Sequence, residues 1–106
     1  MKSISRYLVL ARGDQELTLE EVADCASVHP KFVVELMDLG LITPLRFSET
    51  QTIFRASVVL RIRRIVRIKR DLGVNLPGIA VILDLTEEVK RLRRKIEEIS
   101  CRAGPF

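Results

Sequence analysis

DLGVNLPGIAVILDLTEEVKRLRRKIEEI, from Asp71 to Ile99, is the strongest indication of the fold in this chain, because it joins a tight turn to a long amphipathic helix. Its first residues include Gly73, Asn75 and Pro77, which are typical of the end of one helix and the start of the next. The apolar residues that follow are alternately three and four positions apart, so they share one side of a helix. They form a stripe, here called the seam, made of Ile82, Leu85, Val89, Leu92, Ile96 and Ile99.

The seam needs a partner helix, because the rest of the chain supplies only one small core. Charged residues of both signs flank it, as expected for a helix that is paired on one side and solvated on the other. We therefore predict a homodimer, with a domain over residues 1–73, a coiled-coil dimerisation helix over residues 74–100 and a tail over residues 101–106. The alternative is a terminal helix that folds back on its own domain.

Composition favours a binding protein over an enzyme. The two cysteines, Cys25 and Cys101, are far apart and have no neighbouring ligand, so the sequence predicts no disulfide framework, no metal site and no cofactor. The single histidine, His29, has no nucleophile placed beside it by spacing, so no catalytic residues are predicted. No apolar run is long enough for a signal sequence or a membrane span, which predicts a cytoplasmic protein.

Charge is distributed unevenly along the chain. Residues 1–50 contain five Lys or Arg and eight Asp or Glu, a net charge of −3, whereas residues 51–106 contain thirteen and six, a net charge of +7. An acidic half can bind a basic protein and a basic half can bind nucleic acid. The two halves could equally face each other within one molecule or a dimer.

Local signals in the first half predict a helix-turn-helix. Thr18 and Glu21 form a capping box, T-x-x-E, at the start of a first helix. Pro30 is typical of the first turn of a second helix, and Gly40 is typical of its end.

A wing and a third helix follow the helix pair. Residues 45–55 read as a small hairpin with a strand near Ile53, which could pair with a strand predicted between Ser3 and Ala11. We expect Ser57 to cap a helix from Val58 to Leu72, with Leu72 facing inward, and Asn75 to cap the long helix. The fold class is therefore mainly α: a winged helix-turn-helix with a small β wing and a long C-terminal dimerisation helix.

This order of elements resembles the MerR superfamily. The segment Leu39–Pro44, LGLITP, is similar to the sequence that follows the second helix in that superfamily. The segment Asp71–Leu85, DLGVNLPGIAVILDL, resembles a corner shared by its heat-shock repressors and by the chaperone-modulator proteins, the CbpM family. The resemblance spans about residues 17–99. It implies antiparallel pairing of the dimer helices, whereas the β-branched residues Ile82, Val89 and Ile96 suit a parallel pair, and both orientations stay open.

The second helix favours the chaperone-modulator branch. A DNA-reading helix needs hydrogen-bond donors and positive charge, but here Lys31 is accompanied by Glu35 and Asp38 and by no arginine. The CbpM resemblance implies binding to the J-domain of a CbpA- or DnaJ-like co-chaperone and inhibition of its engagement of Hsp70. Because J-domains present a basic helix, we expect an acidic binding face, helped by exposed members of Phe32 and Met37. The acidic residues are Glu20, Glu21, Asp24, Glu35 and Asp38.

The alternative function is a DNA-binding transcriptional regulator like the heat-shock repressors. Positive residues of the second helix, the wing and the third helix would then contact phosphates. They are Lys31, Arg46, Arg55, Arg61 and Arg64. A minor third possibility is a scaffold without inhibitory activity.

Overall fold

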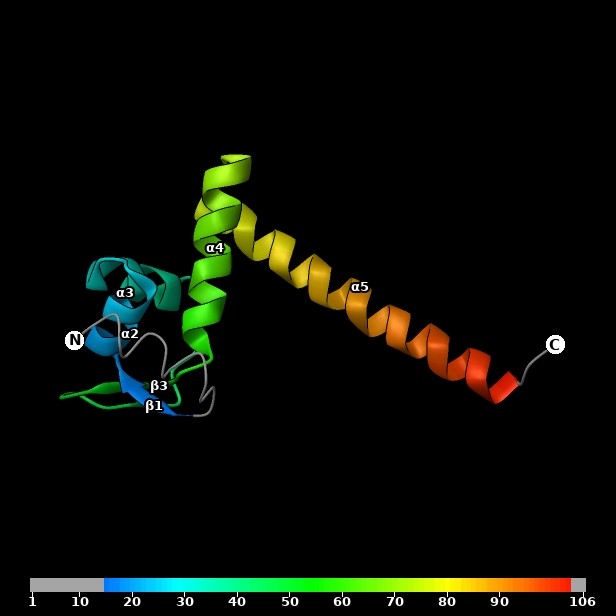
Figure 1. Cartoon of the computed structure of the whole chain (residues 1–106), viewed down its shortest axis with the longest axis horizontal. Coiled ribbons are helices and arrows are strands. Elements are labelled where there is room, and N and C mark those ends of the chain that lie inside the picture. The colour runs from blue at the N-terminus through cyan, green and yellow to red at the C-terminus, as the bar shows by residue number, and fades with distance from the viewer. Residues whose placement is uncertain (1–14, 104–106) are drawn as a thin grey trace.

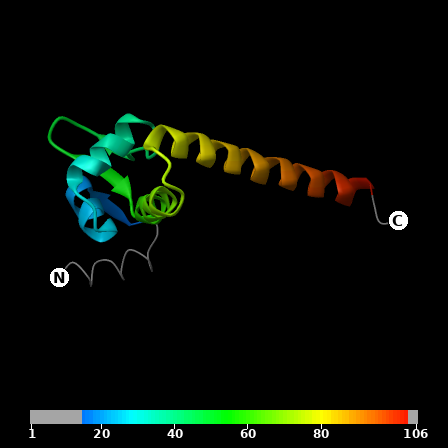
Figure 2. The same cartoon turned by 90° about the horizontal axis from the view of Figure 1, so that it is seen from above.

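The computed structural model describes residues 15–103, which form a small domain and a helical arm (Figure 1). The arm leaves the domain at one end and runs away from it, as the view from above also shows (Figure 2). The predicted fold class is confirmed: helices predominate, with one small antiparallel sheet. In chain order the elements are β1 (Glu16–Thr18), α2 (Leu19–Ala26), α3 (Pro30–Asp38), β2 (Arg46–Phe47), β3 (Thr52–Arg55), α4 (Val58–Leu72) and α5 (Leu76–Ala103).

The sheet has the strand order β1-β3-β2, so the wing strand β3 lies in its centre. β1 pairs antiparallel with β3, with Leu17 opposite Phe54, and the backbone N–H of Ala56 extends the pairing by donating to the Gln15 carbonyl at 2.6 Å. The strand predicted between Ser3 and Ala11 lies outside the described residues. β1 was not predicted from the sequence, because a three-residue strand that runs directly into a helix shows no alternating pattern.

Two of the predicted helix starts are confirmed by side-chain hydrogen bonds. Glu21 N–H donates to Thr18 Oγ1 at 3.2 Å, and Thr18 N–H donates to Glu21 Oε1 at 2.8 Å, which completes the capping box of α2. At α5 the Gly78 N–H donates to Asn75 Oδ1 at 2.9 Å. His29 also caps a helix, since its Nδ1 accepts a hydrogen bond from the Lys31 N–H at the start of α3.

The predicted cap at Ser57 is wrong. Its backbone is already helical, with φ −59° and ψ −20°, and its side chain makes no capping hydrogen bond. A capping hydroxyl reaches the first-turn N–H groups from an extended backbone, as at Thr18, where ψ is 165°. A Ser at a helix start is therefore an ambiguous signal without the backbone geometry.

The core lies between the sheet, the helix pair α2–α3 and the inner face of α4. Leu72, predicted to face inward, is 64% exposed. It lies on the same face of α4 as Ile65, seven residues earlier, but the elements that cover Ile65 do not extend to the last turn of α4. The fully buried large side chains include Phe54, Leu36, Ile62, Ile65, Ile79, Val22, Val33 and Val59.

The long helix α5 is held by its first turns alone. Leu76, Ile79 and Leu83 are buried against the core, whereas every residue from Asp84 to Arg102 is exposed or half-buried. At about 1.5 Å per residue the 28 residues of α5 span about 42 Å. Most of this helix, here called the arm, therefore has no cover within its own chain.

Candidate functional site

The five acidic residues predicted to bind a partner are all exposed. Glu20, Glu21 and Asp24 lie on α2, where Glu21 also serves the capping box. Glu35 and Asp38 lie three residues apart on α3 and share one face of it. The helices α2 and α3 pack against each other in the domain (Figure 1).

The apolar residues of α3 are arranged differently from the expectation. Phe32 and Met37 are half-buried and pack against the core, so they are not the exposed apolar contacts. Val34 and Leu39 are instead 39% and 42% exposed. Helical spacing of three and four residues places them beside the two acids of α3. Part of the outward surface of α3 and its C-terminal cap is here called the α3 face, and it comprises Val34, Glu35, Asp38 and Leu39. The exposed Lys31 lies one turn before Glu35 on the same side of the helix.

The seam of α5 lies almost wholly in the arm. Ile82 is half-buried near the first turns of α5, and the other five residues of the seam are exposed. The exposed fractions are 60% for Leu85, 45% for Val89, 44% for Leu92, 62% for Ile96 and 57% for Ile99. An apolar stripe of this length on one helix face is typical of a protein–protein interface.

Two of the five residues predicted for DNA contact are bound within the chain. Arg46 makes a two-pronged ion pair with Glu16, with nitrogen–oxygen distances of 2.6 and 3.2 Å. Arg61 Nε donates to the Leu41 carbonyl at 2.5 Å. The contact between Arg46 and Glu16 lowers the pKa of Glu16 below its usual range and raises that of Arg46, chiefly through the hydrogen bond.

The other three predicted DNA-binding residues are exposed but not gathered on one surface without acids. Lys31 lies one turn before Glu35 on α3, and Arg55 is near enough to Glu16 to lower the pKa of that carboxyl further. Arg64 lines a charged groove between α4 and α5 in which cations and carboxylates are mixed; the other lining residues are Asp84, Glu87, Glu88, Lys90, Arg91 and Arg94. Carboxylates next to these cations oppose the approach of phosphate groups.

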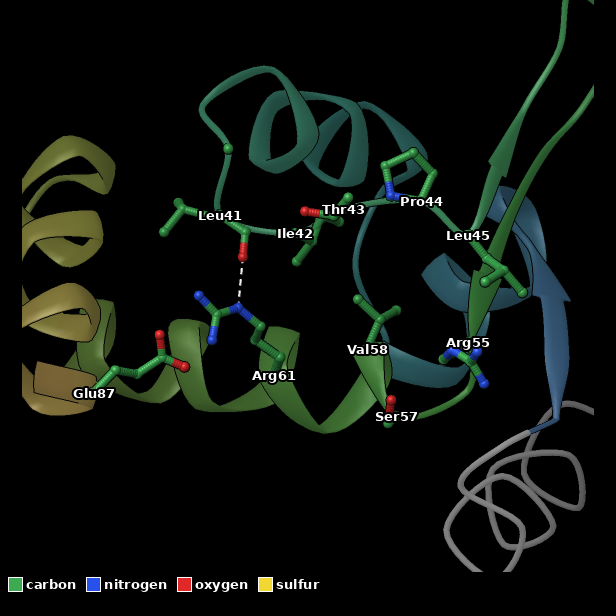
Figure 3. A pocket seen from close by; sticks show the side chains of 11 residues that line it. Leu41, Ile42, Thr43, Pro44, Leu45, Arg55, Ser57, Val58, Arg61 and Glu87 are labelled. Carbon is green, nitrogen blue, oxygen red and sulfur yellow. Dashed lines mark hydrogen bonds between the residues drawn. The ribbon is translucent and has the colours of Figure 1, made fainter. Parts of the chain in front are cut away.

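A groove of about 380 Å³ lies between the connector after α3, the start of α4 and α5. Figure 3 shows Arg61 reaching from α4 to the Leu41 carbonyl, with Glu87 of α5 on the same side of the groove. Residues 40–45 form much of its lining, with Arg55 and Ser57 at one end. The groove follows the LGLITP segment but was not predicted, because its walls come from parts of the chain far apart in sequence.

Within residues 15–103 no three His, Cys, Asp or Glu side chains gather in a way that could hold a metal ion. Nor does any helix in this range combine the length and apolar composition that crossing a membrane requires.

The matches to known proteins cover both the domain and the arm. A model of the MerR HTH family regulatory proteins matches residues 17–100. The chaperone modulatory protein CbpM of Escherichia coli O1:K1 / APEC is 31% identical over 89 residues, which cover 84% of this chain and 88% of the relative. The chain belongs to the CbpM family of MerR-like proteins. The CbpM of Coxiella burnetii strain Dugway 5J108-111 is 26% identical over 98 residues, or 92% of each chain, and that of Pseudomonas entomophila strain L48 is 25% identical over 91 residues.

The range matched by the MerR HTH family model includes both the domain and most of α5. It begins within β1 and ends near the end of α5, so the arm belongs to the family together with the winged domain. The resemblance drawn from LGLITP and from residues 71–85 is thereby confirmed.

Proposed function

We propose that this chain is a chaperone modulator that binds the J-domain of a CbpA- or DnaJ-like co-chaperone and blocks its engagement of Hsp70. The printed name of its relatives, chaperone modulatory protein, supports the modulator role. The main support for this binding mode is the composition of the α3 face, where two carboxylates lie beside two exposed apolar side chains. A DNA-recognition helix needs positively charged hydrogen-bond donors at such positions.

The proposed binding surface combines charge with a small apolar centre. Glu35 and Asp38 would attract the basic helix of a J-domain, and Glu20, Glu21 and Asp24 would extend the negative potential over α2. Val34 and Leu39 replace Phe32 and Met37 as the apolar contacts, because they are exposed on α3. Apolar side chains at the centre of an interface supply much of its binding energy, whereas surrounding charges govern orientation and association rate.

We further propose that the chain acts as a homodimer joined through the seam. Five neighbouring large apolar side chains are at least 44% exposed along one face of the arm. Pairing with a second arm would remove this stripe from water, at a gain of about 25 cal/mol for each Å² of apolar surface buried. The α3 faces belong to the domains, so seam pairing leaves them available to a partner.

The test is a calorimetric titration with the J-domain of the co-chaperone from the same organism, at about 150 mM salt, where charges more than about 8 Å apart are largely screened. We expect saturable binding of one J-domain per chain. The double variant Glu35→Lys/Asp38→Lys should weaken binding at least about a hundredfold, since each close charge pair changes from attraction to repulsion.

The matched control is Glu97→Lys/Glu98→Lys, which makes the same change of charge at exposed positions on the arm outside the seam. This variant should bind like the parent chain. Equal weakening by both double variants would mean that only net charge matters and would reject the α3 face. Absence of J-domain binding, together with duplex DNA binding that falls steeply between about 50 and 200 mM salt, would reject the proposed function in favour of a DNA regulator.

A further inference from the structure

A second hollow, of about 270 Å³, lies between the end of α2 and the outer face of α4. Its floor is formed by Ala26 and Val66, and three arginines surround it: Arg63, Arg67 and Arg70. These arginines are four and three residues apart, so they share one face of α4. Arg61 precedes Arg63 by two residues, or about 200° of helical rotation, and therefore lies on the opposite face, beside the groove of Figure 3.

The structural contacts of these arginines differ from those of Arg61. Arg61 bridges α4 to the connector through the Leu41 carbonyl. Within residues 15–103, Arg63 and Arg67 make no hydrogen bond or ion pair, and Arg70 uses only its Nε, which donates to Asp71 Oδ1 at 3.1 Å. In the part of the chain that the structure describes, none of the three donates to a carbonyl at the end of α2, although that end of a helix attracts cations. Hydrogen bonds that stabilise the fold therefore do not explain why these three arginines lie together.

Three guanidinium groups on one helix face repel one another, which destabilises the helix that carries them. A bound anion removes this destabilisation. Guanidinium forks match phosphate oxygens in geometry, and a phosphate group carries a charge of about −1.5 to −2 at neutral pH, which balances more of the cluster than one carboxylate would. We infer that the hollow formed by Arg63, Arg67 and Arg70 over Ala26 and Val66 is a binding site for a phosphate group.

Size and surroundings favour a single phosphate group over a larger polyanion. The hollow is smaller than the roughly 300–1,000 Å³ of sites that enclose a whole small molecule. Five exposed carboxylates on α2 and α3 belong to the same domain and would repel a nucleic acid strand, whose phosphates are closely spaced. Arg63 is half-buried, so its interaction with an anion is screened less than that of a fully exposed arginine.

The test is titration of the full chain with inorganic phosphate at constant ionic strength set with chloride, followed by calorimetry and by thermal unfolding. We expect saturable binding of one phosphate per chain and a melting temperature that rises with phosphate concentration. Arg63→Gln/Arg67→Gln should weaken binding at least about tenfold and remove the rise, because charge-assisted hydrogen bonds are lost. A phosphoserine peptide, titrated in parallel, distinguishes a phosphorylated protein ligand from the free ion.

The matched control is Lys90→Gln/Arg94→Gln, which removes the same charge from exposed residues of the arm that line the separate groove beside Arg64, and it should leave phosphate binding unchanged. If Arg63→Gln/Arg67→Gln fails to fold, the exposed single variant Arg67→Gln carries the same test. Equal binding by both double variants, or equal stabilisation by sulfate and phosphate, would reduce the effect to general charge and overturn the site. Duplex DNA binding that is lost in Arg63→Gln/Arg67→Gln, without any binding of phosphate, would also overturn it.

Discussion

The domain and the arm contain the same apolar residue types at the same helical spacing, yet they bury them to opposite extents. Ile62 and Ile65 of α4 are fully buried, whereas Ile96 and Ile99 of α5 are 62% and 57% exposed. The inner face of α4 packs against α2 and the first turns of α5, while the arm extends beyond every other described element (Figure 1). Periodicity therefore shows which side of a helix is apolar, and the tertiary structure determines whether other parts of the same chain bury that side.

The largest difference between the two regions is expected when a buried side chain of the core is truncated. Phe54→Ala should lower the free energy of unfolding by about 3–5 kcal/mol, because a fully buried aromatic side chain is replaced by a cavity. Phe47→Ala is the matched variant, since Phe47 is 71% exposed on β2 and should change stability by less than about 0.5 kcal/mol. Urea unfolding of both variants measures the difference, and comparable losses would contradict the assignment of Phe54 to the core.

The second largest effect is expected in the arm and concerns association. Leu85→Asp/Leu92→Asp should convert a dimer to a monomer at micromolar concentration, because charged groups would be buried at the centre of the seam. Sedimentation equilibrium measures the mass, and circular dichroism should still report a folded domain. Leu60→Asp/Leu72→Asp changes similarly exposed leucines outside the seam and should leave the dimer intact. A parent chain that is monomeric at these concentrations would refute seam pairing.

A smaller loss of stability is expected when the side chains at two helix starts of the domain are truncated. Thr18→Ala should lower the free energy of unfolding by about 1 kcal/mol, since it removes the side-chain acceptor of the Glu21 N–H. Ser57→Ala should change it by less than about 0.5 kcal/mol, because Ser57 makes no capping hydrogen bond. Thermal unfolding of the two variants side by side decides the point, and a larger loss at Ser57 would contradict the observed backbone.

The smallest effect concerns the ion pairs, one in the domain and one on the arm. The pKa of Glu16 is lowered by Arg46, so the pair contributes stability above the ordinary glutamate pKa of about 4.3 and loses it as the pH falls through the lowered value. Glu16→Gln should thus melt slightly earlier than the parent chain at pH 7 and at the same temperature near pH 2. The pKa of Glu88 is likewise lowered by Arg91, but that pair lies on the arm, so Glu88→Gln should leave the domain's melting temperature unchanged at both pH values. A persistent difference for Glu16→Gln at low pH would show that the side chain acts by packing and not by charge.

The sequence predicted the helices well because their boundaries depend on neighbours in the chain. The capping box at Thr18, the left-handed glycine at Gly73 and the Asn75 cap each involve residues within four positions of one another. The same local rules failed at Ser57 and missed β1, where pairing with β3 some 37 residues away defines the strand. The acids of the candidate site were expected at the surface and are found there, whereas the apolar residues beside them were misassigned.

The helices, the carboxylates of the second helix and the apolar stripe of the arm could all be predicted from the sequence alone, because they follow from periodicity and short-range contacts. Which side chains of α3 face outward depends on the tertiary structure, since Phe32 and Met37 pack against a core that is formed mostly by other elements. The tertiary structure also decided that Arg46 is held by Glu16, 30 residues earlier, and Arg61 by the Leu41 carbonyl, 20 residues earlier. The three arginines over Ala26 likewise come together with α2 only in the folded chain. Such pairings depend on the distance in space between residues that are remote in sequence, and no local pattern encodes that distance.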